Sequence, residues 1–132
     1  MAESAGSGGH APHELGRRGE RLAECYLRGR GWSILARNYR FGRREIDLVV
    51  RRGDLVVFVE VKTRGGTGYG GPAAAINWRK RREIEGVAAD YLFRNRLGDV
   101  SVRFDVVAIE AVMSQGGRRL EHIEDAWRID WG

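Results

Sequence analysis

The sequence predicts an α/β domain in which helices flank a central mixed β-sheet. Two stretches, at about residues 14–30 and 77–96, carry apolar residues at helical spacing. The segments between and after them are short, rich in Val, Ile, Phe and Tyr, and bounded by turn residues, which is typical of strands. Read in order, these elements form an α-β-β-β-α-β core.

The two expected helices are defined by their apolar stripes. In the first, Leu22 and Leu27 lie on the stripe and Gly31 supplies the stop. In the second, Ile84 belongs to the stripe, and a basic run at residues 79–82 opens the helix. Cations at a helix N-terminus oppose the helix dipole, so contacts with phosphate explain this run better than helix stability does. A solvated helix face is the alternative.

Five strands are expected, and the second and third should form a hairpin. Their ranges are 32–40, 44–51, 55–63, 102–110 and about 120–124. If Arg52-Gly53 is a two-residue loop, Arg51 faces Asp54 across the hairpin.

Composition and length indicate one soluble globular domain. The chain has 132 residues, of which 42% are hydrophobic and 31% charged, and this argues against a disordered protein. Residues 1–13 are small and polar, so we expect a disordered tail there and a single domain over residues 14–132. No apolar run approaches the roughly 18 residues that span a bilayer, no secretory signal is recognisable, and Cys25 has no partner for a disulfide. We therefore expect a cytoplasmic protein with no membrane contact.

The charge balance favours an anionic partner, above all nucleic acid. Lys and Arg total 23 against 18 acidic residues, a net charge of +5. Only Lys62 and Lys80 are lysines, which marks these two positions for attention in a chain that otherwise uses arginine. The alternative is that a modest positive charge serves solubility alone.

Charged residues on two neighbouring strands form the candidate site. Glu60 and Lys62 interrupt an apolar strand and, being two residues apart, share one face. The hairpin register above places Asp47 opposite Phe58 on that face, and Glu45 opposite Glu60. Like charges that face each other across a sheet are unfavourable unless a cation lies between them. The alternative is an ordinary ion pair between Glu60 and Lys62 on an exposed strand.

This acidic patch suits a hard divalent cation. Mg²⁺ prefers carboxylate and water oxygens, and it can acidify water and bind a phosphodiester oxygen. Lys62 could orient that water or stabilise the charge that develops on the phosphate. Glu20 is a further candidate because it borders the apolar stripe of the first helix. The alternative for Glu20 is a surface acid paired with a neighbouring arginine.

The motifs resemble those of the PD-(D/E)xK nuclease superfamily. The pattern is an acid in an early helix, then E-I-D at residues 45–47, then F-V-E-V-K at residues 58–62. In particular, the chain resembles the bacterial YraN-like family, whose members are similar to archaeal Holliday-junction resolvases. The matching segments are residues 16–20, 36–40, 44–49, 57–64, 69–70 and 103–107, together with Lys80. One departure is Ile46, which stands where the superfamily pattern has proline, although many members also lack it.

The resemblance implies a restriction-endonuclease-like fold and Mg²⁺- or Mn²⁺-dependent hydrolysis of DNA, with branched or single-stranded junctions as substrates. It implies that Asp47, Glu60 and the carbonyl of Val61 hold the metal. Lys62 would be the catalytic lysine and Glu20 an acid that assists the metal, with Glu45 of the acidic patch in support. Junction resolvases cut two strands, which is consistent with a homodimer. The alternatives are a nucleic-acid-binding module without turnover and a DNA-processing adaptor.

A basic rim is expected around the acidic patch, because carboxylates repel the phosphate backbone until metal and flanking cations reverse the local field. The rim residues are Arg17, Arg18, Arg43, Arg44, Arg64, Arg79, Lys80, Arg81 and Arg82. The glycine-rich segment 64–72 is expected to be a flexible flap over nucleic acid, with Tyr69 available to stack on a base.

Two polar residues near the end of the chain are expected to have other roles. Asp105 alternates with apolar neighbours and should make structural hydrogen bonds. His122 stands alone in the sequence, so no Ser/His or Cys/His triad is predicted.

Overall fold

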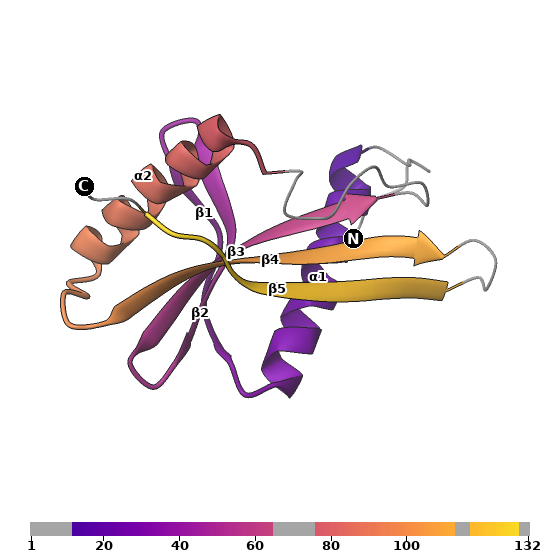
Figure 1. The fold of residues 1–132 in the computed structure, drawn as a ribbon, viewed down its shortest axis with the longest axis horizontal. Coiled ribbons are helices and arrows are strands. Elements are labelled where there is room, and N and C mark those ends of the chain that lie inside the picture. Colours follow the sequence, from indigo (N-terminus) through magenta and orange to yellow (C-terminus); the bar gives the residue numbers. More distant parts are fainter. Residues whose placement is uncertain (1–11, 65–75, 113–116, 130–132) are drawn as a thin grey trace, which may run out of the picture.

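The computed structural model describes residues 12–64, 76–112 and 117–129, which form two helices and five strands (Figure 1). In chain order they are α1 (Pro12–Gly29), β1 (Ser33–Phe41), β2 (Arg44–Arg52), β3 (Leu55–Arg64), α2 (Trp78–Arg94), β4 (Ser101–Val112) and β5 (Gly117–Trp127). The predicted α/β class and the predicted order of elements are confirmed. Helix α1 begins two residues before its predicted start, and residues 1–11 of the predicted tail lie outside the described residues.

The strands form one mixed sheet in the order β1-β2-β3-β4-β5. β3 and β4 pair in parallel, whereas the other neighbours pair antiparallel. A parallel pair needs a crossover connection, and α2 lies in the segment that connects β3 to β4. The two strands that carry the predicted site, β2 and β3, are therefore internal strands with a neighbour on each side.

The two helices cover opposite faces of the sheet. Alternate residues of β3 divide between two apolar clusters: Val56 and Phe58 pack with α2, whereas Val57 and Val59 pack with α1. Figure 1 shows α2 beside one end of the sheet and α1 across the other face. Neither helix of the described ranges combines the length and apolar character that a membrane crossing requires.

The β2–β3 hairpin turns one residue later than predicted. Arg52 pairs with Leu55, so the two-residue loop is Gly53-Asp54 and not Arg52-Gly53. Gly53 has φ +60°, a left-handed conformation that glycine adopts without a steric penalty. A glycine in the first position of a two-residue hairpin loop matches the twist of the flanking strands, which explains the observed turn.

The later turn changes the pairing of the predicted site residues. Val49, and not Asp47, lies opposite Phe58, so the predicted pairing of Asp47 with Phe58 is wrong. Glu45 likewise does not face Glu60, because the β2–β3 ladder ends at the pair Leu48–Val59. The register moves by two positions, and an even shift leaves side chains on the faces that alternation predicts.

Gly19 allows α1 to approach β3 closely. A Cβ atom at this position would overlap the Cγ2 methyl of Thr63 and would reach within 3.8 Å of Ile109. Any other residue at position 19 would therefore push the helix away from the sheet. The glycine sets the distance at which the next residue, Glu20, is held from the strands.

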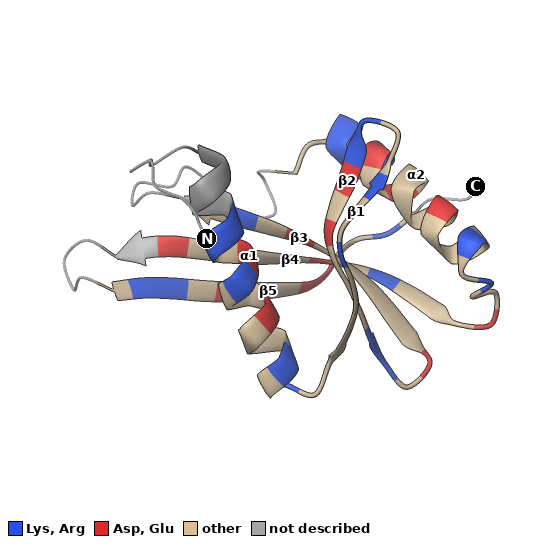
Figure 2. Cartoon of the chain, turned by 180° about the vertical axis from the view of Figure 1, so that it is seen from behind, with Lys and Arg blue, Asp and Glu red and all other residues tan. Residues whose placement is uncertain are grey.

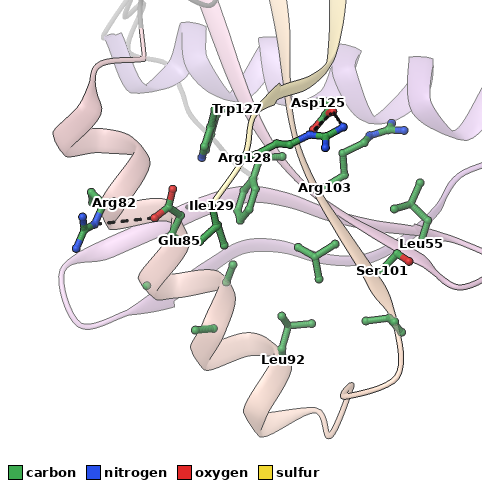
Figure 3. Close-up of a pocket in the computed structure, with 16 residues that line it drawn as sticks. Leu55, Arg82, Glu85, Leu92, Ser101, Arg103, Asp125, Trp127, Arg128 and Ile129 are labelled. Atoms are coloured by element: carbon green, nitrogen blue, oxygen red, sulfur yellow. Dashed lines mark hydrogen bonds and ion pairs between the residues drawn. The ribbon is translucent and has the colours of Figure 1, made fainter. Parts of the chain in front are cut away.

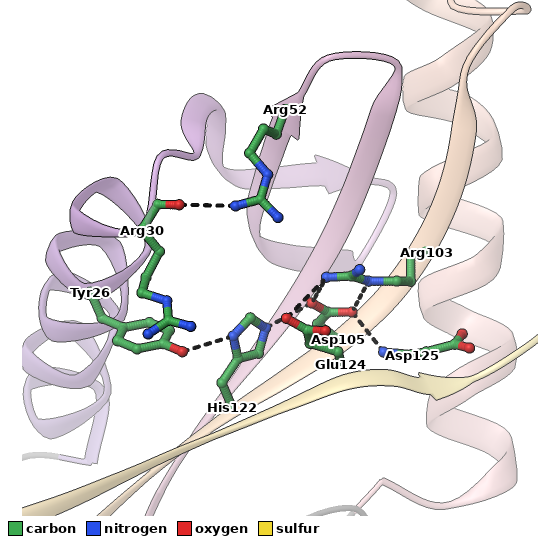
Figure 4. A network of polar contacts seen from close by, with 8 residues as sticks. All are labelled: Tyr26, Arg30, Arg52, Arg103, Asp105, His122, Glu124 and Asp125. Atoms are coloured by element: carbon green, nitrogen blue, oxygen red, sulfur yellow. Dashed lines mark hydrogen bonds and ion pairs between the residues drawn. The ribbon is translucent and has the colours of Figure 1, made fainter.

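Asp105 is the centre of a buried polar network between β4 and β5, as predicted for a structural acid (Figure 4). It accepts two hydrogen bonds of 2.8 Å from Arg103 and one of 2.9 Å from the backbone N–H of Asp125, and it lies 2.7 Å from Nε2 of His122. Burial opposes ionisation of Asp105, but the hydrogen bonds with His122, Arg103 and Asp125 outweigh it and lower its pKa. His122 is not isolated: its Nδ1 lies 3.1 Å from the hydroxyl of Tyr26, which ties β5 to α1.

Candidate functional site

The site begins where β2 and β3 separate. Beyond the pair Leu48–Val59 the backbone ladder stops, and the carboxylate of Asp47 accepts a 2.7 Å hydrogen bond from the backbone N–H of Val61 instead. The alternation of β2 breaks at Asp47: Ile46 packs on the α2 side and Leu48 on the α1 side, although residues two apart on a regular strand share a face. Asp47 thus lies in the opening between two internal strands.

Glu60 approaches the same opening from β3. Its side chain is 6% exposed, and its carboxyl shares a hydrogen bond with Asp47. Nζ of Lys80, in the first turn of α2, lies 3.7 Å from its Oε2. Lys62 follows two residues later on β3, close enough for its charge to favour ionisation of Glu60.

A second set of carboxylates faces Asp47 from the α1 side. Glu20 of α1, Glu45 of β2 and Asp47 each offer an oxygen within 4.8 Å of the others. Glu45 is also paired across the β1–β2 ladder with Arg40, whose Nε lies 3.3 Å from Oε1 of Glu45. Glu20 and Glu45 thus lie close to Asp47, although Glu45 pairs with Arg40 of β1 and not, as predicted, with Glu60 of β3.

Asn38 of β1 joins two of these carboxylates. Its side-chain amide donates one hydrogen bond of 3.0 Å to Glu20 and another of 2.8 Å to Glu45. The backbone of Asn38 has φ +49°, the left-handed region that asparagine tolerates better than most residues. Both amide hydrogens are thus used to hold the two carboxylates beside Asp47.

The electrostatics of the cluster disfavour full ionisation. Burial, followed by the charge of Glu60, raises the pKa of Asp47 to about 8, and Glu20 and Glu45 add to this shift. Burial also raises the pKa of Glu60, while the charges of Lys80 and Lys62 partly oppose the shift. At neutral pH the Asp47 carboxyl therefore carries a proton, and a cation that replaced this proton would relieve the repulsion among the carboxylates.

Glu24 lies near the cluster but is already neutralised. Arg37 donates two hydrogen bonds of 2.7 Å to its carboxylate, and Arg28 donates one of 3.0 Å. The hydrogen bonds from Arg37 lead the interactions that lower the pKa of Glu24 to about 2. Because its oxygens are occupied by guanidinium groups, Glu24 is a poor ligand for a metal.

The α1 side of the cluster opens into a pocket of about 540 Å³. Glu20, Glu45 and Asp47 contribute its acidic lining, and Arg17, Arg21 and Arg40 contribute basic groups. Figure 2 shows basic and acidic residues alternating along α1 and a basic stretch at the start of α2. A phosphate group that enters this pocket therefore meets cations as well as the acidic cluster.

The predicted basic rim divides between two places. Arg17 and Lys80 contact the acidic site, as the pocket lining and the ion pair with Glu60 show. Arg81 and Arg82 lie instead beside Trp127 and Trp78, and Arg44 reaches toward Gly86 of α2. Arg18, Arg43 and Arg79 are exposed. Tyr69 and the side chain of Arg64 lie outside the described part of the chain.

The donor set fits a hard divalent cation. The carboxyl groups of Glu20, Glu45, Asp47 and Glu60 supply only oxygen ligands, the type that Mg²⁺ and Mn²⁺ prefer. Burial and the charges of neighbouring carboxylates raise the pKa of Asp47, so a cation bound at this position would stabilise its ionised form. Zinc-type ligands are absent from this group, which contains no His or Cys.

Sequence reasoning missed Asn38, Arg21 and Arg40. Asn38 lies on a strand and could not be connected to Glu20 without the packing of α1, because the contact spans two elements. Arg40 could have been found from the β1–β2 register, which places it opposite Glu45. Arg21 follows Glu20 directly in the sequence, but the orientation of α1 on the sheet decides which of its arginines reach the pocket, and the sequence alone does not give that orientation.

The fold and the site define a small α/β protein with a half-buried acidic cluster at the opening of its central hairpin. The profile of Uncharacterised protein family UPF0102 matches residues 19–109, a range that includes the acidic cluster and Lys62. The chain belongs to the UPF0102 family, in agreement with the predicted YraN-like resemblance.

Relatives within this family cover almost the whole chain. A UPF0102 protein of Geobacter sulfurreducens is 44% identical and aligns with 94% of this chain and 96% of its own length. A UPF0102 protein of Chlorobium limicola is 42% identical, with 93% and 98% covered. One of Rhodococcus opacus is 45% identical, with 86% and 95% covered.

Proposed function

We propose that this protein is a Mg²⁺- or Mn²⁺-dependent endonuclease that hydrolyses phosphodiester bonds in DNA, with branched or single-stranded junctions as substrates. The observation that carries the proposal is the meeting of Asp47 and Glu60 where β2 and β3 separate, with Lys62 two residues further along β3. The resemblance of these motifs to the PD-(D/E)xK superfamily supports the same activity.

Each residue of the site has a role in this proposal. Asp47, Glu60 and the carbonyl of Val61 hold the metal, and Glu20 assists it. The bound cation supplies Lewis-acid chemistry, polarising the phosphodiester and acidifying water. Lys62 holds the attacking water or the charged phosphate oxygen with its ammonium group.

Further residues organise the site and receive the substrate. Asn38 fixes the directions of Glu20 and Glu45 through its amide. Lys80 lies 3.7 Å from Glu60 and limits the repulsion between that carboxylate and Asp47. The arginines at the mouth of the pocket, Arg17 and Arg21, receive the DNA backbone.

The proposal is tested by cleavage of labelled branched, nicked and single-stranded DNA with Mg²⁺ or Mn²⁺ and then with chelator. We expect cleavage that needs the metal and is lost in Lys62→Ala, while Arg118→Ala, which removes an exposed cation of β5, cleaves like the wild type. Removal of the group that holds the attacking water or stabilises the charge on the phosphate should cost at least about 100-fold in rate. Circular dichroism confirms that both variants fold.

Two outcomes would replace the proposal. DNA binding that is indifferent to metal and to Lys62, without cleavage, would support a non-catalytic nucleic-acid-binding module. Neither cleavage nor salt-sensitive DNA binding would support an adaptor in DNA processing.

A further inference from the structure

Two tryptophans and three arginines line a second hollow beside the start of α2. The hollow has a volume of about 360 Å³ and lies between the start of α2 and the end of β5. Its lining consists of Trp78, Arg81, Arg82, Glu85, Trp127, Arg128 and Ile129. It adjoins a larger groove of about 910 Å³ along α2, with which it shares five lining residues: Arg82, Glu85, Trp127, Arg128 and Ile129 (Figure 3).

Trp78 offers an aromatic surface to solvent. Its side chain is 70% exposed at the start of α2, and the guanidinium of Arg82 lies 5.1 Å from its ring centroid. An exposed indole beside a cation is the combination on which single-stranded nucleic acid stacks, because every base has a π-face and every phosphate has a negative charge.

Trp127 supplies a hydrogen-bond donor that has no partner. The residue is 7% exposed, one face of its ring stacks on Phe104 at 5.1 Å, and Arg81 lies 5.7 Å from its centroid. Its indole N–H is buried and makes no hydrogen bond within the described residues. The indole nitrogen points toward α2, where Glu85 and Arg82 lie (Figure 3). A buried donor without an acceptor is unfavourable, and a ligand acceptor would satisfy it.

We infer that this hollow, here named the tryptophan pocket, binds one unpaired nucleotide of the nucleic acid, an inference that rests on the proposed function. The base stacks on Trp78 and accepts from the indole N–H of Trp127, while Glu85 accepts from a ring N–H or amino group of the base. Arg82 and Arg128 contact the adjoining phosphates.

The position of the tryptophan pocket agrees with a strand that continues from the acidic site. Trp78 lies two residues before Lys80, and the ammonium of Lys80 is 3.7 Å from Glu60. A strand that passes around the start of α2 would therefore place one nucleotide at Trp78 and a neighbouring phosphate near Glu60. This arrangement selects substrates with an unpaired segment beside the scissile bond.

A protein partner is the main competing occupant. Phe93, at the opposite end of α2, is 82% exposed and does not line the tryptophan pocket. A protein that covered α2 as an apolar surface would use both Phe93 and Trp78, whereas a nucleotide would use Trp78 alone. Phe93→Ala is therefore the matched control for Trp78→Ala.

The test measures binding of a fluorescein-labelled oligothymidylate of about ten nucleotides and of a blunt duplex of the same length, both in chelator so that no cleavage occurs. We expect Trp78→Ala to weaken single-strand binding by roughly 5- to 150-fold, the range for loss of one base–aromatic stack. Trp78→Phe should retain most of the binding, Phe93→Ala should bind like the wild type, and duplex binding should be equal in all four proteins.

Several results would overturn the inference. An unchanged affinity in Trp78→Ala, an equal loss in Phe93→Ala, or wild-type protein that binds no single strand would each do so. A change in sedimentation of Trp78→Ala without a change in single-strand binding would assign the surface to self-association. If Trp78-dependent binding is seen but Lys62-dependent cleavage is not, the inference stands and the nuclease proposal fails. If Lys62-dependent cleavage is seen but single-strand binding does not depend on Trp78, the nuclease proposal stands and the inference fails.

Discussion

The carboxylate of Asp47 lies 2.7 Å from the backbone nitrogen of Val61, and this hydrogen bond bridges β2 and β3 beyond the last pair of their ladder. A side chain thus replaces a backbone acceptor in the middle of the sheet. The replacement leaves room for carboxylates between two internal strands without leaving the Val61 N–H unsatisfied. The position of the acidic cluster follows from this opening.

The first prediction concerns the pH dependence of stability. Asp47 has a folded pKa of about 8, above its ordinary value of 3.8, so the folded state holds a proton that the unfolded state releases. The contribution of this proton to the free energy of unfolding is fully present below pH 3.8 and is lost as pH rises toward 8. In chelator, the melting temperature of Asp47→Asn should therefore exceed that of the wild type by an amount that grows between about pH 5 and pH 8.

Thermal melts of both proteins over that pH range check the prediction. Asp54→Asn, in the exposed turn of the same hairpin, controls for the loss of one negative charge. Parallel curves for wild type and Asp47→Asn would mean that Asp47 is ionised in the metal-free protein.

The second prediction concerns Asn38. Asn38→Ala removes two hydrogen bonds and places alanine at φ +49°, so it should lower the free energy of unfolding by about 2 kcal/mol. Asn38→Gly removes the same bonds but adopts this backbone freely, and should cost less. Both variants should show a smaller rise in melting temperature on addition of Mn²⁺. A full wild-type rise in either one would show that Glu20 and Glu45 need no support from Asn38.

The third prediction tests the close approach of α1 to β3. Gly19→Ala overlaps the methyl of Thr63, and the resulting shift should lower the free energy of unfolding by about 1–2 kcal/mol despite the better helix propensity of alanine. Gly29 ends the same helix, and a Cβ atom there would have no neighbour within 4 Å, so Gly29→Ala should be neutral or stabilising. Urea denaturation of the two variants makes the comparison, and equal effects would contradict it.

The fourth prediction concerns the buried network of Figure 4. Asp105→Asn removes the nearer of the two anions beside Arg103, whose side chain is 19% exposed, and should cost about 3 kcal/mol. Because the pKa of Asp105 is lowered in the folded protein, its contribution is present at neutral pH and is lost as pH falls. The difference between wild type and Asp105→Asn should therefore shrink in acid. A difference that is constant from about pH 7 to pH 3 would exclude this origin.

The elements of the fold can be predicted because their signals are local. Apolar residues at helical spacing predict both helices, and their members Leu27 of α1 and Ile84 of α2 are buried against the sheet. The alternation of side chains predicts that residues 56–59 of β3 divide between the two faces of the sheet, as they do. The position of the hairpin turn is the exception. The sequence is compatible with Gly53 in either loop position, and the structure places it in the first, where its left-handed backbone suits the turn.

The candidate site can be predicted only in part, for a different reason. Asp47 and Glu60 lie on strands joined by a short turn, so their closeness follows from the chain itself. Asn38 and Lys80 reach the cluster from elements whose rotation is set by tertiary packing. The same packing directs Arg81 and Arg82 toward the two tryptophans, although their place in the basic run predicts a position beside the acidic site.

The most direct measurement is an anomalous difference map of crystals of the wild-type protein soaked in Mn²⁺. We expect a peak in the opening between β2 and β3, bounded by the carboxylates of Asp47 and Glu60 and by the carbonyl of Val61. The peak should be absent from crystals of Asp47→Asn treated in the same way. Wild-type crystals without a peak at this opening, or with manganese bound only between Glu20 and Glu45, would contradict the proposed metal site.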